Sequence, residues 1–153
     1  MRFMLLMIPQ GYEKAAPGTM PDAKAVEATM KYNESLQKAG VLRTLEGLRP
    51  PSMGPRVTFF GGKPKVIAGP FAEAKETLGG YWMIQVNSKE EAIEWVSRCP
   101  ASDDETIEVR QVQEFSEFPA EIQAAASGFP DMQARKIRST GGELNVEQEA
   151  CCC

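Results

Sequence analysis

The pattern of apolar and polar positions divides the chain into alternating strand-like and helix-like segments. Residues 2–8 form a short continuous apolar run, which is typical of a central strand buried on both faces. After a loop rich in proline and glycine, Thr19 and Asp22 have the spacing of a capping box. An apolar stripe with steps of three and four then predicts a long amphipathic helix that ends at Gly40. The stripe consists of Ala25, Thr29, Tyr32, Leu36 and Ala39, with Val26 and Met30 beside it.

The rest of the pattern adds three strands, a hairpin and a second helix. Residues 41–48 and 81–86 have strand composition, and residues 56–67 predict a hairpin that turns at Gly61 and Gly62. Ser88 and Glu91 predict a capped helix that continues to Pro100, and residues 107–110 alternate as a last strand. This order predicts an α+β fold: a ferredoxin-like antiparallel sheet with two helices on one face and an added hairpin.

A sheet of this kind has one face that no helix covers. We expect that face to include several large apolar side chains, and a second subunit is the natural cover for so much apolar surface. The sequence therefore predicts a homodimer. The candidates for the open face are Phe3, Leu5, Phe59, Trp82 and Ile84.

Length and composition favour a single main domain. The chain has 153 residues, of which 42% are hydrophobic and 25% charged. We expect residues 1–115 to form the α+β domain and residues 116–127 to form a short C-terminal helix. Residues 128–153 have no usable periodicity and few large apolar side chains, so a mobile tail is predicted there.

The charge of the chain argues against two classes of partner. The formal net charge is −4, and lysine and arginine are scattered along the sequence, so direct binding to nucleic acid is not expected. The apolar start is too short for a membrane helix and has no cleavage pattern. No membrane association is expected, and a cytoplasmic location is predicted.

Missing or isolated residues limit the possible chemistry. The chain has no histidine, which excludes the Ser-His and Cys-His nucleophile arrangements. Cys99 stands alone and Cys151, Cys152 and Cys153 form a terminal run, so the paired spacing of a zinc site is lacking. We expect no metal and no cofactor. Cys99 near a helix C-terminus is expected to be unreactive, because the helix dipole disfavours a thiolate there.

Several stretches of the sequence are similar to one known family. GPFAEAKETLGGYWMIQVNSKEEAIEWVSRCP, together with IEVRQV, MRFMLLM and GLRPPSMGPRV, resembles the YCII-related family and in particular its DGPF-domain branch. The resemblance covers about residues 1–112 and implies a bacterial dimeric α+β barrel with a cleft beside the Gly-Pro-Phe loop. The function of the family is largely uncharacterised. Some relatives look like small lyases or dehydrochlorinases with a His-Asp pair, and DGPF members are often encoded beside extracytoplasmic-function sigma factors.

This sequence departs from the family pattern at two informative positions. Ala68 precedes Gly69-Pro70-Phe71 where the motif has aspartate, and Arg49 stands in GLRPPS where many relatives have histidine. A His-Asp mechanism therefore does not transfer to this chain, and we favour a protein that is not an enzyme.

The loop at residues 69–80 has a structural and a functional interpretation. In the structural one, Gly69 and Pro70 set a turn, Phe71 plugs one end of the barrel, and Gly79 with Gly80 lets two backbones approach closely. In the functional one, the loop presents charged side chains to a cleft opposite GLRPPS. The ligand-binding candidates are then Arg49, Ser52, Gly69, Phe71, Glu73 and Lys75, and the weak catalytic candidates are Glu73 and Glu76.

Three functions remain open at the level of sequence. The first is binding of a small anionic or aromatic molecule between the two loops, with Arg49 gripping a carboxylate. The second is a lyase- or isomerase-type enzyme in which Glu73 or Glu76 transfers a proton. The third is an interaction protein linked to a sigma factor, which rests on family analogy alone. Trp82 and Trp95 are expected to pack in the core or in a dimer interface rather than against a ligand.

Overall fold

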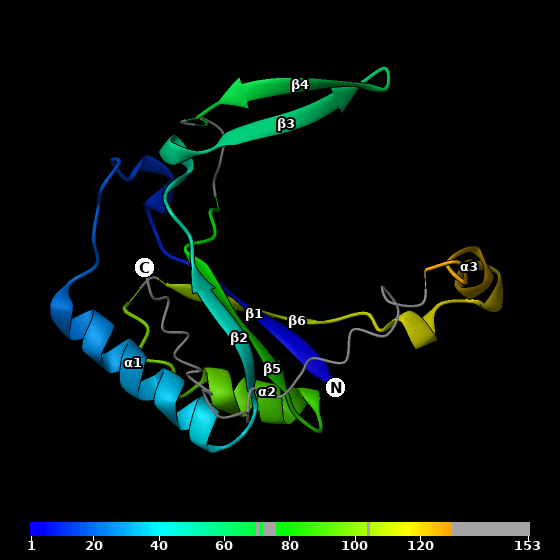
Figure 1. Ribbon diagram of the computed structural model, residues 1–153. Helices are drawn as coiled ribbons and strands as arrows, with labels where there is room; N and C mark the ends of the chain where they lie inside the picture. Colours follow the sequence, from blue (N-terminus) through cyan, green and yellow to red (C-terminus); the bar gives the residue numbers. More distant parts are fainter. Residues whose placement is uncertain (70, 72–75, 104, 130–153) are drawn as a thin grey trace, which may run out of the picture. The chain divides into compact units, whose positions relative to one another are not determined.

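The computed structural model describes residues 1–69, 71, 76–103 and 105–129 of the chain. The chain divides into two compact units, and the boundary between them in the sequence lies between Gln113 and Glu114. The first unit contains a four-stranded antiparallel sheet and a separate two-stranded hairpin (Figure 1). Within the described residues, no helix is both long enough and apolar enough to cross a membrane.

The four-stranded sheet has the strand order β2-β5-β1-β6. Its strands are β1 (Arg2–Ile8), β2 (Leu42–Gly47), β5 (Gly80–Gln85) and β6 (Thr106–Gln111). Helix α1 (Ala23–Lys38) connects β1 to β2, and helix α2 (Lys89–Val96) connects β5 to β6. This connectivity confirms the predicted ferredoxin-like α+β fold.

Both helices begin at a polar cap, although the caps differ in detail from the sequence prediction. The Asp22 carboxylate accepts hydrogen bonds from the amides of Lys24 and Ala25, so Asp22 itself is the N-cap of α1. The predicted pairing of Thr19 with Asp22 is wrong, because the Thr19 hydroxyl donates to the carbonyl of Ala16 instead. At α2, Ser88 accepts from the amide of Glu91 as predicted, but the helix ends at Val96 rather than at Pro100.

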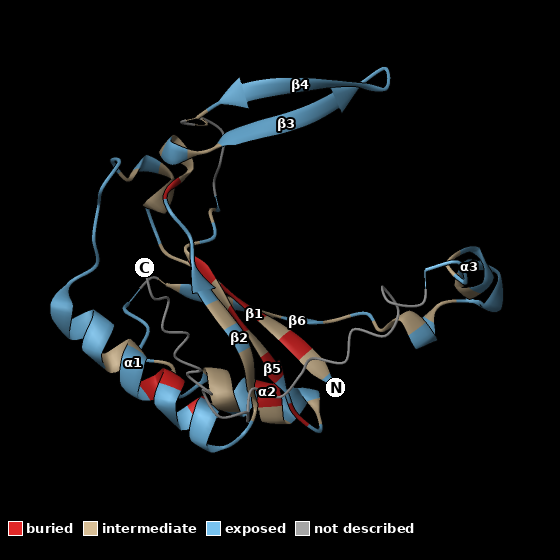
Figure 2. Cartoon of the chain, viewed as in Figure 1, coloured by how far each residue is buried: buried red, intermediate tan, exposed pale blue. Residues whose placement is uncertain are grey.

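The core lies between the sheet and the two helices (Figure 2). Alternate residues of the strands point to this side, and the strand register places Leu5 opposite Trp82 and Phe3 opposite Ile84. Both helices contribute side chains to the same cluster, so they cover the same face of the sheet. The buried cluster consists of Phe3, Leu5, Tyr32, Leu36, Trp82, Ile84, Val86 and Ala92.

The sequence prediction for the open face of the sheet was wrong. Phe3, Leu5, Trp82 and Ile84 lie on the helix-covered face, and Phe59 belongs to the hairpin rather than to the four-stranded sheet. Strand alternation shows that Phe3 and Leu5 share a face, but it does not show which face the helices cover. The residues that alternate with the core set form the opposite face, and they include Met4, Leu6, Tyr81 and Met83.

The hairpin pairs β3 (Pro55–Phe60) with β4 (Lys63–Ala68) and turns at Gly61 and Gly62, as predicted. Both glycines have positive φ, as a two-residue hairpin turn of this type requires. Every residue of the two strands is exposed (Figure 2). The hairpin therefore buries no side chain of its own in this structure.

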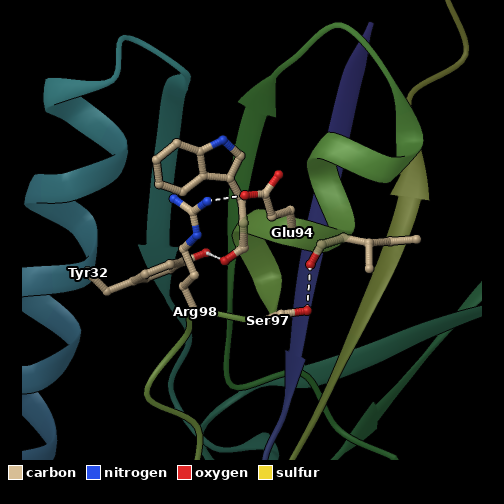
Figure 3. Close-up of polar contacts among 6 residues, drawn as sticks. Tyr32, Glu94, Ser97 and Arg98 are labelled. Carbon is tan, nitrogen blue, oxygen red and sulfur yellow. Dashed lines mark hydrogen bonds and ion pairs between the residues drawn. The ribbon is translucent and has the colours of Figure 1, made fainter.

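A small set of polar contacts lies at the end of α2, and one of them reaches α1 (Figure 3). The Tyr32 hydroxyl donates a hydrogen bond of 3.2 Å to the carbonyl of Trp95, and the Ser97 hydroxyl donates to the carbonyl of Ile93 at 2.8 Å. Arg98 pairs with Glu94, and its guanidinium lies 4.7 Å from the centroid of the Trp95 ring. The Tyr32 hydrogen bond joins α1 to α2, and the other contacts lie within the end of α2 and the residues that follow it.

The second unit contains a 3-10 turn at Phe115–Glu117 and the short helix α3 (Ala120–Ala125). The helix lies within the range predicted for it. Most of the predicted mobile tail, residues 130–153, lies outside the described residues, and its predicted mobility stays a prediction.

Candidate functional site

The apolar stripe of α1 does not have one environment along its length. Tyr32 and Leu36, in the second half of the helix, are buried in the core. In the first half, the Val26 side chain is 40% exposed and the Met30 side chain is 55% exposed. The same stripe therefore leaves the core at its N-terminal end.

The first half of α1 lines a cavity of about 550 Å³. The cavity lies between α1 and the end of the sheet where β2 meets β5, and the loop after β1 contributes to its wall. Most lining side chains are apolar, and the volume is in the range of small-molecule sites. The apolar lining includes Met7, Pro9, Met20, Pro21, Ala25, Val26, Met30, Leu45, Leu48, Trp82 and Pro100.

A buried hydrogen bond joins two of the lining residues. The indole Nε1–H of Trp82 donates to Oδ1 of Asn33 at 2.7 Å. The Tyr32 ring packs edge-on against Trp82 with a centroid distance of 5.8 Å. Asn33 is 8% exposed, so its side chain is held in place between the core and the cavity.

The charges around the cavity are acidic. Among the described residues that line it, the charged ones are Glu46 and Glu105. Glu105 accepts a hydrogen bond from the amide of Ser102 at 2.6 Å. Glu46 pairs with Tyr81 in the strand register and so belongs to the set of side chains on the opposite face of the sheet. Glu105 is therefore the carboxylate that the cavity side of the sheet presents.

The two loops that were predicted to flank a cleft do meet. A Cβ atom on Gly69 would lie 2.3 Å from the carbonyl oxygen of Pro51, so only glycine permits this approach. Ser52, in the 3-10 turn Pro51–Met53, donates to the carbonyl of Ala15 at 3.1 Å. The guanidinium of Arg56 lies 4.0 Å from the centroid of the Phe71 ring. The junction is closely packed around Gly69.

The described ligand-binding candidates are not among the residues that line the cavity. Of the described candidates, none of Arg49, Ser52, Gly69, Phe71 and Glu76 lines the cavity. Arg49 is exposed and contacts the Met53 sulfur at 4.0 Å. Glu73 and Lys75 lie outside the described residues. A binding or catalytic role for these six ligand candidates and for Glu76 stays a prediction.

The structural interpretation of the paired glycines is confirmed. A Cβ atom on Gly79 would lie 2.6 Å from Cγ of Pro9, and one on Gly80 would lie 2.8 Å from the carbonyl oxygen of Glu46. Gly79 also accepts a hydrogen bond from the amide of Leu48 at 2.8 Å. Both glycines line the cavity, so their close packing shapes its wall.

Sequence reasoning missed the cavity because it treated the whole stripe of α1 as core. One signal was available. Asn33 is a polar residue directly beside Tyr32, between two positions of the apolar stripe, and a buried amide of this kind needs a specific partner.

Cys99 is half-buried and packs against the core. Burial raises the pKa of its thiol to about 11, and the nearby Glu105 carboxylate acts in the same direction. The thiol is therefore protonated at neutral pH, which agrees with the prediction that it is unreactive. Within the described part of the chain, no three histidine, cysteine, aspartate or glutamate side chains gather as they would around a metal ion.

Comparison with known families identifies a match over most of the chain. The model of the YCII-related domain matches residues 1–116, which is most of the chain. The chain belongs to the YCII-related family. No curated protein matches this YCII-related protein. The matched region includes the whole four-stranded sheet, α1, α2 and the hairpin, and thus both the cavity and the loop junction.

Proposed function

We propose that this YCII-related protein binds a small, mostly apolar molecule in the cavity beside the first half of α1. The observation that carries the proposal is the cavity itself, about 550 Å³ in volume and lined mainly by apolar side chains. Binding would cover the Val26 and Met30 side chains, which the fold leaves about half exposed.

A cavity-filling variant tests the proposal against a matched control. Ala25 lines the cavity, whereas Ala23, in the same turn of α1, is not among the lining residues. Residues two apart on a helix lie about 200° apart around its axis, so the two alanines face different ways. With the neutral fluorescent probe N-phenyl-1-naphthylamine, we expect Ala25→Phe to abolish binding and Ala23→Phe to retain it. Equal binding by both variants would contradict the proposal.

A second candidate function, with less support, is the anion binding that the sequence predicted at the loop junction. In it, a small anion binds between GLRPPS and the Gly-Pro-Phe loop, with Arg49 as its anchor, in a chain of the DGPF branch. The exposed guanidinium of Arg49 favours it, because among the described residues no carboxylate pairs with this group. An Arg49→Ala variant should lose the thermal stabilisation that such an anion provides. No observation on the described residues favours the lyase, isomerase or sigma-factor hypotheses, and Glu76 is exposed.

We also propose that the protein is a homodimer, and the hairpin now supports this better than the open face does. The register places Pro55 opposite Ala68, Val57 opposite Val66 and Phe59 opposite Pro64, so one face of the hairpin is wholly apolar. Phe59 is 74% exposed and Val66 is 66% exposed. Since an isolated two-stranded hairpin is marginally stable in water, a second copy of the chain is the expected cover.

Light scattering on a sizing column tests the dimer. Val57→Asp places a charge on the apolar face of the hairpin, whereas Thr58→Asp places it on the other face. We expect Val57→Asp to produce monomers and Thr58→Asp to leave dimers intact. A monomeric wild-type protein would remove the proposal.

A further inference from the structure

We propose that the cavity selects uncharged, mostly apolar molecules that carry a hydrogen-bond acceptor, and that Asn33 recognises this acceptor. The inference rests on the proposed function, because it names the ligand class of the same cavity. It assigns Asn33 a role in specificity in addition to its role in packing.

The orientation of the Asn33 amide follows from its neighbour. The Trp82 indole can only donate, so the atom of Asn33 that it contacts at 2.7 Å is the oxygen. The amide nitrogen of Asn33 therefore occupies the other position. Among the described residues, no acceptor bonds to this nitrogen, although the Asn33 side chain is more than nine-tenths buried and lines the cavity.

Two N–H donors at the cavity wall to which no described residue bonds favour a ligand that accepts a hydrogen bond. The amide nitrogen is accessible to water, and an oxygen of a bound ligand would take the place of that water. The Oδ1 bond to Trp82 holds the amide in one orientation, so the donors need no rearrangement before a ligand arrives. A carbonyl, ether or hydroxyl oxygen would meet this requirement.

The remaining lining defines the rest of the ligand. Apolar side chains from α1, the sheet and the loop after β1 surround the cavity, which favours an apolar body such as a two-ring aromatic system. No lysine or arginine is among the described lining residues, and Glu105 presents a carboxylate. A ligand carboxylate would meet no cationic partner and one like charge, so organic acids are disfavoured.

Three probes of similar size and shape separate the effect of a hydrogen-bond acceptor on affinity from the effect of a negative charge. 2-Acetonaphthone has a carbonyl oxygen, 2-isopropenylnaphthalene replaces that oxygen with a CH₂ group, and 2-naphthoate carries a negative charge. In calorimetric titrations at neutral pH, we expect the ketone to bind about fivefold more tightly than the alkene, in line with one net hydrogen bond. We expect the carboxylate to bind most weakly of the three.

A nearly isosteric variant tests the role of Asn33 itself. Asn33→Asp keeps an acceptor for the Trp82 indole and replaces the two amide donors with a carboxyl oxygen. At pH 8, the preference for the ketone over the alkene should disappear in this variant. Thr29→Val is the matched control, because it removes a hydroxyl from the cavity lining while Asn33 is retained, and the preference should persist there.

The side-chain amide signal of Asn33 provides a reading that does not depend on the variant folding. In nitrogen–proton spectra of the wild-type protein, this signal should move on addition of the ketone and much less on addition of the alkene. Equal affinities for ketone and alkene, or an unmoved Asn33 signal during ketone binding, would overturn the inference while leaving the proposed function standing. Absence of binding by both neutral probes would overturn the inference and the proposed function together.

Discussion

The two halves of α1 share one apolar stripe but differ in what they contact. The second half packs Tyr32 and Leu36 into the core and is tied to α2 through the Tyr32 hydroxyl. The first half keeps Val26 and Met30 about half exposed beside a cavity. The difference teaches that amphipathic periodicity predicts which side of a helix faces inward, but not whether protein or a ligand fills the space on that side.

The largest expected effect is a difference in the loss of stability between a substitution in the second half of α1 and one in the first half. Leu36 is fully buried, so Leu36→Ala should lower the free energy of unfolding by about 3 kcal/mol. Met30→Ala should lower it by less than about 1 kcal/mol, because much of that side chain is already in contact with water. Urea denaturation of both variants measures the difference. Similar losses in the two variants would mean that the first half of α1 is packed in the core after all.

A smaller effect is expected at Asn33, where the two halves meet. Asn33→Leu leaves the buried Trp82 indole without its acceptor, which should cost about 2 kcal/mol. In a Trp82→Phe background the same substitution should cost less, since no indole donor remains to be satisfied. A double-mutant cycle measures the coupling of the two side chains. A coupling energy near zero would show that the hydrogen bond does not hold this boundary in solution.

The smallest expected effect is a loss of stability in alkaline solution that arises at the core end of α1. Burial raises the pKa of the Cys99 thiol from 9.0 to about 11, and burial also raises the pKa of Tyr32. Between these two thiol pKa values the unfolded chain has lost the Cys99 proton while the folded chain still holds it. Stability is therefore complete below about pH 9 and falls as the pH rises toward 11.

Denaturation at a series of pH values in a Cys99→Ala variant tests this assignment. The part of the alkaline loss that Cys99 causes should disappear, whereas a Val26→Ala variant at the cavity end should retain it. An unchanged profile in Cys99→Ala would show that the thiol is not buried as the structure has it.

The fold was largely predictable from local pattern. The strand composition of residues 81–86, the hairpin glycines and the stripe of α1 each specify an element without reference to the rest of the chain. The assignment of Phe3 and Leu5 to the open face was wrong. Side-chain alternation divides the residues of a strand between two faces, but it does not show which face the helices cover. The error at Thr19 also arose from two equivalent choices. Asp22, three residues later, is an equally good N-cap, and the sequence alone does not decide between the two.

The candidate site was much less predictable. The resemblance implied a cleft beside the Gly-Pro-Phe loop, and the structure shows a close contact between Gly69 and Pro51 there. The cavity depends on how far the start of α1 stands from β2 and β5, which is a matter of tertiary packing rather than of spacing in the sequence. The Asn33–Trp82 bond joins residues 49 positions apart, and no local pattern encodes it.

The most direct test of the central claim uses the methionine methyl groups as reporters. Met7, Met20 and Met30 line the cavity, whereas Met4 and Met83 lie on the opposite face of the sheet. In protein labelled with carbon-13 at its methionine methyls and titrated with 2-acetonaphthone, the account predicts shifts in the signals of Met7, Met20 and Met30 with those of Met4 and Met83 unmoved. Shifts confined to Met4 and Met83 would place the ligand on the other face and contradict the account.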